Sequence, residues 1–375
     1  MMETDTAAMG DLRVTVSRDE LAQKLAIVAR GVSSRSAVQI LSGILLRSEG
    51  GQLHLAATDM DLSLRASLPA RVDGEGAVVV PGKILVDLIR QLPADEVQIE
   101  HGADEGVLRI ASGSSRSQVN TYAADDFPRL PDLDVPLHGL AAGVVLETIA
   151  RVRRAASRDE SRPVLTGILV RFEPGKLVMA ATDSYRLSVK ETPLEQQVPE
   201  MEAIVPARAL EELSRIAAGA ETLELGVREN QVIFGADGVW LTTRRIDGQF
   251  PNYRQLLPEA FEHTVPVNRL ELLDVVRRTS VLAQRNSPLR LRFAEGELVV
   301  SSQTQDVGES RESMPVAFTG EPLEIGFNAE FLRDGIDSVE GDELLVNLIS
   351  PLRPGLLKGG SGDFWYLIMP IRLAG

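Results

Sequence analysis

The feature that most constrains this chain is an internal repeat. Residues 41–59 read LSGILLRSEGGQLHLAATD, and residues 165–183 read LTGILVRFEPGKLVMAATD. Aligned without a gap at an offset of 124 residues, the two stretches are identical at 12 of 19 positions, whereas unrelated stretches match at about one. The stretches are therefore copies, and the offset is the period of a repeated structural unit.

The period divides the chain into three units. Three periods of 124 account for 372 of the 375 residues, and a prior of roughly 100 to 200 residues per domain allows three domains. A more diverged third copy, LRLRFAEGELVVSS, begins at residue 289 and repeats the order of strand, Glu-Gly turn and strand. We expect domains at 1–137, 138–262 and 263–375, with residues 1–10 as a flexible extension.

Each unit is predicted to be an α+β domain with two helices packed on antiparallel sheets. Ser17 and Glu20 have capping-box spacing, which indicates a helix start. The remaining residues of each unit alternate between apolar and polar types and are punctuated by Gly turns, as in antiparallel hairpins. Apolar residues at helical spacing predict the six helices at 17–31, 83–91, 144–158, 207–216, 268–285 and 329–338.

Composition excludes several classes of protein. The chain has no cysteine, which removes disulfides, thiolate zinc sites and thiol nucleophiles together. The N-terminal sequence MMETDTAAMGDL is not a secretory signal, and no apolar run reaches the length of a membrane span, so we expect a cytoplasmic protein without membrane contact. The formal net charge of −15 argues against nucleic acid as a partner, because phosphate binding needs Lys and Arg.

No catalytic or metal site is expected, and no cofactor is implied. The four histidines, His54, His101, His138 and His263, are scattered and lack metal-ligand spacing. A phosphate-binding loop is also missing from the sequence. Asp59 and Asp183 end the two copies of AATD, and two interpretations of them are open: paired metal carboxylates of a nuclease or phosphoesterase, or turn residues that bond backbone. Their occurrence once per repeat favours the turn.

Tandem copies that each present an equivalent face indicate either a solenoid or a closed ring. A domain of 124 residues is a ball roughly 35 Å across. Three such balls in a triangle leave a hole of about 5 Å, whereas six in a hexagon leave a hole of roughly 35 Å. A ring that passes a DNA duplex therefore requires six domains, which means two chains.

Four motifs resemble one known family. They are ATDSYRLSV at 181–189, TTRRIDGQFPNYRQLLP at 242–258, EIGFNAEFL at 324–332 and the terminal MPIRL at 369–373. With these motifs at the family's spacing across all three units, the chain is similar to the bacterial DNA polymerase III β subunits, the β sliding clamps.

The resemblance implies a non-catalytic, homodimeric ring of six clamp domains that encircles duplex DNA without sequence preference. It further implies loading by a clamp loader complex and tethering of the replicative DNA polymerase α subunit. Other polymerases, ligase and mismatch-repair proteins are implied as partners that dock through short peptide motifs. Two other functions are open on the sequence: a metal-dependent phosphoesterase, and an acidic peptide-binding scaffold that does not contact DNA.

The charge of the predicted helices bears on the argument that an acidic chain should not bind nucleic acid. Over the six predicted helices there are 16 Lys and Arg against 11 Asp and Glu; subtracting these from the chain totals of 39 and 54 leaves 23 against 43 elsewhere. If the helices line the hole, DNA meets positive charge there; ordinary solvated helix faces are the alternative. The DNA-contacting positions expected from the charge pattern and the resemblance are Arg35, Arg151, Arg154, Arg158, Arg162 and Arg208.

The resemblance also places a peptide-binding groove between the second and third domains, closed by the C-terminal tail. An ordinary edge strand is the alternative for that tail. Met and Leu adapt to different partners while Arg and aromatic side chains anchor them. The groove positions carried over are Thr182, Ser184, Tyr185, Arg186, Leu187, Pro251, Leu256, Asn328, Phe331, Met369, Pro370, Ile371, Arg372 and Leu373.

Two departures from the family pattern affect the expected groove. Ser184 and Tyr185 stand where many relatives have Gly-His, and the polar pair Asn286 and Ser287 stands where relatives often have an aromatic residue. For the dimer seam, the resemblance implies that Val281 and Leu282 of one chain pack near Val119 of the other. Burial inside their own domains is the alternative for these three residues.

Overall fold

The fold is described from a computed structural model of residues 10–33, 37–103, 105–283, 287–305 and 307–373. Arg35, Asn286 and, apart from Gly10, the predicted N-terminal extension lie outside these residues. Within them the chain alternates short helices with antiparallel strands, as an α+β fold does. The predicted fold class is confirmed.

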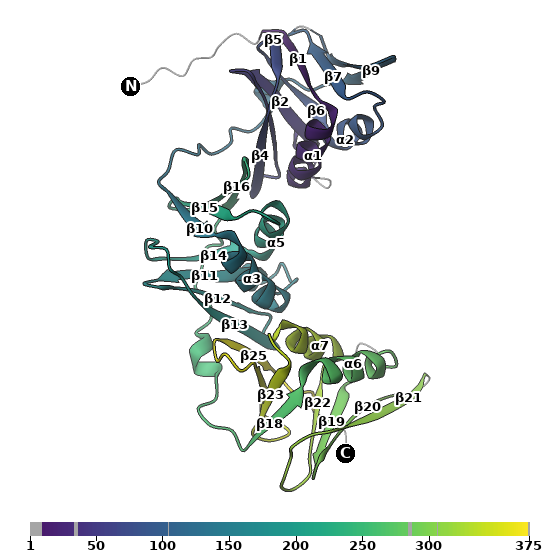
Figure 1. Cartoon of the computed structure of the whole chain (residues 1–375), viewed down its shortest axis with the longest axis vertical. Coiled ribbons are helices and arrows are strands. Elements are labelled where there is room, and N and C mark those ends of the chain that lie inside the picture. Colours follow the sequence, from purple (N-terminus) through teal and green to yellow (C-terminus); the bar gives the residue numbers. More distant parts are fainter. Residues whose placement is uncertain (1–9, 34–36, 104, 284–286, 306, 374–375) are drawn as a thin grey trace. The chain divides into compact units, whose positions relative to one another are not determined.

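Apart from an additional strand, β5, in the first repeat and an additional short helix, α4, in the second, the same order of helices and strands occurs three times along the chain (Figure 1). The first repeat contains β1 (Leu12–Ser17), α1 (Arg18–Val28), β2 (Gly43–Glu49), β3 (Gln52–Thr58), β4 (Leu62–Pro69), β5 (Arg71–Gly74), β6 (Ala77–Pro81), α2 (Gly82–Arg90), β7 (Glu96–His101), β8 (Val107–Ser112) and β9 (Ser115–Asn120).

The second repeat contains β10 (Leu137–Ala141), α3 (Ala142–Val152), the short α4 (Pro163–Thr166), β11 (Gly167–Glu173), β12 (Lys176–Thr182), β13 (Arg186–Pro193), β14 (Met201–Pro206), α5 (Ala207–Ile216), β15 (Thr222–Val227), β16 (Gln231–Ala236) and β17 (Val239–Arg244). The third contains β18 (His263–Asn268), α6 (Arg269–Ser280), β19 (Leu289–Ala294), β20 (Glu297–Thr304), β21 (Gly308–Pro315), β22 (Leu323–Phe327), α7 (Ala329–Ser338), β23 (Glu343–Leu348), β24 (Gly355–Lys358) and β25 (Phe364–Ile368).

The six predicted helices are present, and their starts follow local capping. The Ser17 hydroxyl accepts a hydrogen bond from the Glu20 amide at 3.5 Å, which confirms the predicted cap. Asn268 and Asn328 cap α6 and α7 in the same way.

Three of the predicted helix ranges extend too far at their C-terminal ends. The windows 17–31, 144–158 and 268–285 end instead at residues 28, 152 and 280. After α1 and α3 the chain tightens into single 3-10 turns, at Ala29–Gly31 and Arg153–Ala155. Apolar spacing continues through such a turn, so periodicity alone placed the ends several residues too far.

Two eight-stranded sheets join neighbouring repeats by backbone pairing. In the first sheet β17 of the second repeat pairs with β4 of the first, and the strand order is β10-β15-β16-β17-β4-β3-β2-β6. In the second sheet β13 of the second repeat pairs with β25 of the third, and the order is β14-β11-β12-β13-β25-β24-β23-β18. The second repeat therefore gives four strands to each sheet.

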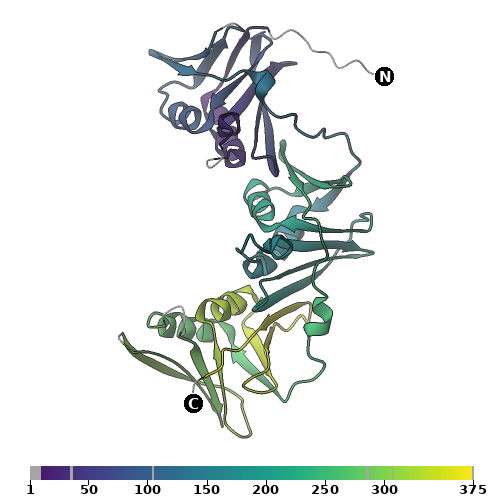
Figure 2. The same ribbon diagram turned by 180° about the vertical axis from the view of Figure 1, so that it is seen from behind.

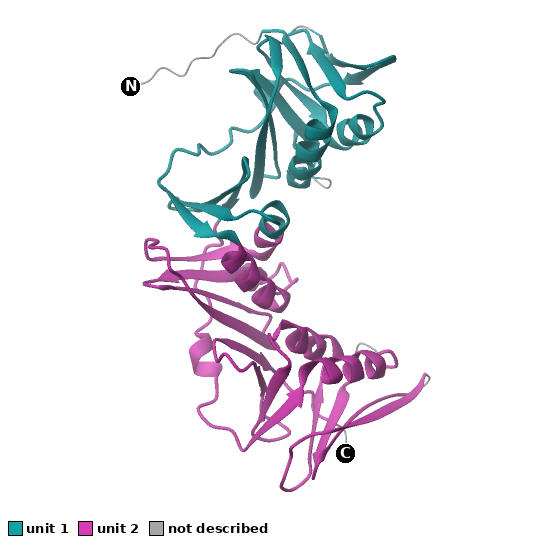
Figure 3. Ribbon diagram, viewed as in Figure 1, with its two compact units in different colours: residues 1–142, 212–244 teal, residues 143–211, 245–375 magenta. Residues whose placement is uncertain are grey.

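The compact units of the chain follow these sheets (Figure 3). Unit 1 comprises residues 1–142 and 212–244, and unit 2 comprises residues 143–211 and 245–375. Each unit thus contains one eight-stranded sheet. Two boundaries between the units fall inside α3 and α5 of the second repeat, and the third follows the end of β17. Cross-repeat strand pairing determines this division.

Helices cover one face of the strands within each unit. In unit 1, α1 and α2 pack together and α1 lies against β3 and β4; in unit 2, α6 and α7 lie side by side (Figures 1 and 2). Leu21, Leu25, Leu85 and Ile89 are fully buried in the core beneath α1 and α2. The matching core of the third repeat contains Tyr366, which is fully buried under α7.

Gly335 of α7 tests this packing. A Cβ there would come within 2.5 Å of two Tyr366 ring carbons and 2.9 Å of Leu357 Cδ1, so Gly335→Ala should lower the free energy of unfolding by about 1–3 kcal/mol. Gly143→Ala in α3 is the control, because no atom lies within 4 Å of its added methyl. We expect that control to be neutral or slightly stabilising. Urea denaturation followed by circular dichroism measures both, and equal effects would contradict the packing described.

Candidate functional site

A tight turn between β12 and β13 builds one wall of the site in unit 2. The Thr182 hydroxyl donates to the Arg186 carbonyl at 2.6 Å and accepts from the Ser184 amide at 3.2 Å. Asp183 Oδ1 accepts from the amides of Tyr185 and Arg186 at 2.9 and 3.0 Å. Ser184 has a φ of 80°, and the turn holds the Tyr185 side chain in solvent at 61% exposure.

Arg186 is the buried centre of the site. Its Nε donates to Asp183 at 3.0 Å and its Nη1 donates to Asp334 at 2.7 Å. Its guanidinium lies 4.2 Å from the centre of the Phe331 ring, a cation–π contact. The Tyr366 hydroxyl, 3.4 Å from Nη1, donates onward to the Phe331 carbonyl at 2.8 Å.

Charge partners keep this buried guanidinium ionised. Burial alone lowers the pKa of Arg186, but Tyr366, Asp334 and Asp183 together raise it above its ordinary value. Burial raises the pKa of the Tyr366 phenol well above its ordinary value, so the hydroxyl remains a neutral donor. The result is a fixed positive group beside two aromatic rings, since Tyr185 stacks on Phe331 with ring centres 6.5 Å apart.

The C-terminal tail crosses the same region. The Met369 amide donates to the Tyr185 carbonyl at 2.9 Å, and the Ile371 amide donates to the Gly326 carbonyl at 2.8 Å. Gly326 is required there, because a Cβ would lie 2.6 Å from Leu373 Cδ2 and 2.9 Å from the Ile371 oxygen. The tail therefore continues from β25 across the end of β22 and bounds the site.

The structure brings most of the predicted groove residues together in unit 2. Tyr185, Arg186, Phe331 and Met369 are joined by the contacts above, while Asn328 caps the helix that carries Phe331. Pro251 and Leu256 are exposed on a segment anchored by Phe250 and Tyr253, which pack on the sheet. Thr182 and Leu187 are buried, as Arg186 is; Ser184 and Arg372 are exposed, and Pro370, Ile371 and Leu373 are half-buried.

The predicted DNA-contacting arginines are mostly paired with acidic side chains. Arg151 forms salt bridges with Glu147 and Glu340 at 3.2 and 3.6 Å. Arg154 contacts Asp337 at 2.5 Å and Asp334 at 3.6 Å. The predicted positions Arg158 and Arg208 are exposed.

Two contacts connect the predicted DNA-contacting arginines to the groove residues. Asp334 is shared between Arg154 and Arg186, and Arg162 donates to the Ser184 hydroxyl at 3.0 Å and to Asp159 at 3.0 Å. Sequence reasoning missed Asp334 and Tyr366 as supports of the groove. No local signal identifies them, because Asp334 is 148 residues from Arg186 in the chain.

The predicted seam residues differ in burial. Val119 of β9 is 8% exposed and belongs to the core of its own unit, whereas Val281, just after α6, is 79% exposed. Leu282 is half-buried, and its carbonyl accepts from the Thr304 hydroxyl at 2.7 Å.

The two repeat aspartates lie in turns. Asp59 Oδ1 accepts from the amides of Asp61 and Leu62 at 3.1 and 2.8 Å, as Asp183 does in its own turn. The turn interpretation is confirmed. Among the described residues, no group of three or more His, Asp or Glu side chains is arranged to hold a metal ion, and none of the helices there is long and apolar enough to cross a membrane.

Comparison with protein families matches the chain in three consecutive parts. The N-terminal domain of the DNA polymerase III β subunit matches residues 12–131, the central domain matches 140–252 and the C-terminal domain matches 254–372. The class of protein is therefore a three-domain, non-catalytic DNA sliding clamp.

Relatives and solved structures agree with this class. The β sliding clamp of Streptomyces coelicolor is 31% identical over 97% of this chain and 100% of its own length, and that of Synechococcus elongatus is 34% identical over 96% and 100%. The crystal structure of the C. crescentus β sliding clamp has a TM-score of 0.92 at 29% identity and covers 98% of this chain and 100% of its own. The chain belongs to the bacterial DNA polymerase III β subunit family, the β sliding clamps.

A ligand-bound relative is also similar. The Pseudomonas aeruginosa sliding clamp bound to griselimycin has a TM-score of 0.89 at 27% identity and covers 97% of this chain and 100% of its own.

Removing the carboxylate of Asp334, which Arg154 and Arg186 share, tests how the buried Arg186 side chain is stabilised. Asp334→Asn leaves the buried guanidinium with Asp183 as its remaining carboxylate partner, so we expect the free energy of unfolding to fall by about 1–3 kcal/mol. Asp337→Asn on the same helix removes a partner of the more exposed Arg154 and should cost less than about 1 kcal/mol. Urea titration of the two variants compares them, and a larger loss in Asp337→Asn would refute the central place given to Asp334.

Proposed function

We propose that the chain forms a homodimeric ring of six clamp domains around duplex DNA and tethers DNA-processing enzymes there. The observation that carries this proposal is the end-to-end match of three β-subunit domains along residues 12–372. We propose domain limits at 1–137, 138–262 and 263–375. The protein acts in the cytoplasm and catalyses no reaction.

Strand pairing supports the dimer. Inside each unit, the last strand of one repeat pairs with the fourth strand of another: β17 with β4, and β25 with β13. By position in the repeat, β9 is the remaining last strand and β21 is the remaining fourth strand, and both lie at sheet edges. Pairing of β9 from one chain with β21 from a second copy completes the pattern and closes the ring.

The proposed ring retains DNA by enclosing it, and the arginine side chains contact the phosphates only weakly. Arg151, Arg154 and Arg162 already have acidic neighbours within the chain, which reduces their attraction for phosphate. Weak, sequence-independent contact suits a protein that must slide, because strong phosphate contacts would anchor it.

Short peptides dock in the unit 2 groove. The fixed Arg186 charge, the stacked Tyr185 and Phe331 rings and the exposed side chains of Leu256 and Met369 combine an anchor with adaptable apolar contacts. The partners proposed for this groove are the clamp loader complex, the replicative DNA polymerase α subunit, other polymerases, ligase and mismatch-repair proteins.

Linearisation of DNA tests the ring. The protein is loaded on nicked circular DNA by the clamp loader of its own bacterium, isolated by gel filtration, and the circle is then cut once. Release after the cut is expected, because a closed ring slides off an end. Protein that stays on the cut DNA as long as on the intact circle binds directly, which contradicts the sliding mechanism.

Tyr185→Ala tests the groove. Because Tyr185 is 61% exposed, its removal should leave stability unchanged while weakening binding of griselimycin about tenfold, as loss of an aromatic anchor does. Leu270→Ala on α6, where 50% of Leu270 is exposed, is the matched control and should bind normally. Isothermal titration calorimetry measures both affinities. Unchanged binding by Tyr185→Ala would remove this residue from the groove.

A further inference from the structure

Unit 1 contains a second copy of the groove turn. The Thr58 hydroxyl donates to the Leu62 carbonyl at 3.0 Å and accepts from the Met60 amide at 3.0 Å, as Thr182 does one period later. Met60 has a φ of 81° where Ser184 has 80°.

The hydrogen bond between this turn and the end of a neighbouring strand is also repeated. The Arg244 amide, at the end of β17, donates to the Asp61 carbonyl at 3.0 Å. This bond repeats the one from Met369, at the end of β25, to Tyr185. Unit 1 therefore has the framework of the unit 2 groove, a turn with a strand end fastened across it.

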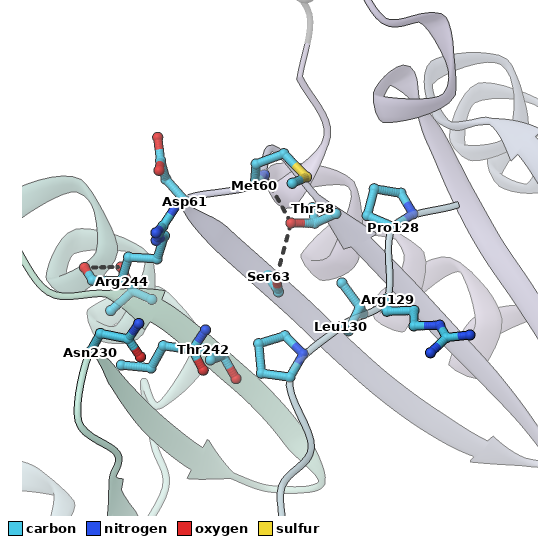
Figure 4. Close-up of a pocket in the computed structure, with 13 residues that line it drawn as sticks. Thr58, Met60, Asp61, Ser63, Pro128, Arg129, Leu130, Asn230, Thr242 and Arg244 are labelled. Atoms are coloured by element: carbon cyan, nitrogen blue, oxygen red, sulfur yellow. Dashed lines mark hydrogen bonds between the residues drawn. The ribbon is translucent and has the colours of Figure 1, made fainter. Parts of the chain in front are cut away.

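A pocket of about 200 Å³ lies at this framework (Figure 4). The segment Pro128–Pro131 forms one side, and the turn residues Met60 and Asp61 form another. Asn230 comes from the turn between β15 and β16, and Arg244 comes from the end of β17. Figure 4 shows the Thr58 hydroxyl between the Met60 amide and the Ser63 hydroxyl, so the turn is held from inside.

A larger hollow of about 1240 Å³ adjoins the pocket and shares the lining segment Pro128–Pro131 with it. It extends over the sheet as far as Trp240. We call the two hollows together the unit 1 groove. The basic side chains that line it are Arg47, His54, Arg65, Arg129, Arg228 and Arg244, and the acidic ones are Asp61, Asp125 and Asp132.

The arginines of the unit 1 groove are available to a ligand. None of the five forms a salt bridge with a carboxylate in the described parts of the chain. Arg65 and Arg228 donate to the backbone carbonyls of Pro131 and Asp134. Burial lowers the pKa of Arg65, with Asp132 acting in the opposite direction, so an incoming carboxylate would compensate a partly desolvated charge.

The chemistry of this groove differs from that of unit 2. At the repeat offset of 124, Asp61 stands at the position of Tyr185 and Leu62 at that of Arg186. Arg244 corresponds to Met369 because each donates its amide to the matching turn carbonyl. The aromatic and methionine contacts are therefore replaced by polar and basic ones, in a protein whose net charge is −15. The framework is retained while the preference for a partner changes.

We propose that the unit 1 groove is a second docking site, which binds an extended acidic peptide from a partner protein. Carboxylates of the peptide pair with Arg129, Arg244 and the deeper Arg65. Three aspartates along the same walls repel a continuous phosphate backbone, whereas a peptide can place its carboxylates between them. This favours a peptide over single-stranded nucleic acid.

A site-specific fluorophore can report on this groove, because the chain has no cysteine of its own. Asn230→Cys carries the dye in the unit 1 groove, and Leu256→Cys carries it in the unit 2 groove as the matched reporter. The probe is the octapeptide Glu-Asp-Leu-Asp-Glu-Leu-Asp-Gly, titrated into the full-length protein at low salt. A peptide with Lys at each acidic position and a ten-nucleotide oligothymidine are titrated in parallel.

We expect the acidic peptide to change the Asn230→Cys signal and to leave the Leu256→Cys signal unchanged. Arg129→Glu, added to the Asn230→Cys reporter, should weaken this binding by about fivefold or more. Arg353→Glu reverses an exposed charge in unit 2 and should change it by less than about twofold.

Four results would overturn the proposal: no signal with the acidic peptide, an equal response to the Lys peptide, equal weakening by the two charge reversals, or tighter binding of the oligothymidine. The last of these would assign the groove to nucleic acid. Because the Leu256→Cys reporter is read in the same titrations, each result is separate from the fate of the unit 2 groove.

Discussion

Backbone pairing between strands of different repeats is the constraint on which this structure depends. β4 and β17 are far apart in sequence, yet five consecutive residues of each are paired in register, and β13 and β25 are joined likewise. An antiparallel ladder fixes both the direction and the register of its strands. The turn after β12 and the end of β25 are consequently held at a set distance, and the groove exists because this ladder does.

Arg186 shows how the core of unit 2 and its groove are connected. Its side chain is 8% exposed, but it contacts Phe331, whose ring is half-buried and stacks with an exposed tyrosine. Isolated burial of a guanidinium is costly, and two carboxylates with a phenol offset that cost. Asp334, shared with Arg154, also joins the groove to the arginines that follow α3.

The sequence predicted the repeats, their helices and the residues that gather in the groove. These features depend on residues close together in the sequence. The turn at Thr182 begins with the same residues, AATD, as the turn at Thr58, and the spacing of Ser17 and Glu20 indicates the start of a helix. The pairing of β17 with β4 was not predictable, because an alternating pattern does not name a partner strand. Charge counting identified the arginines near α3 but not their salt bridges, since Glu340 and Asp337 lie far along the chain. The basic unit 1 groove was missed for the same reason, as its arginines come from separate strands and a connecting segment.

The edge strands β9 and β21 have a consequence for the separated chain. A strand with an unpaired row of amides and carbonyls can recruit any other exposed strand, and such edges lead to aggregation when they are long and uncovered. β9 has six residues and β21 has eight, so the separate chain exposes both of these edges, and the β9–β21 seam proposed above would cover them. If that seam opens, both edges are exposed again, so an open form of the proposed ring has to close quickly or be covered by another protein.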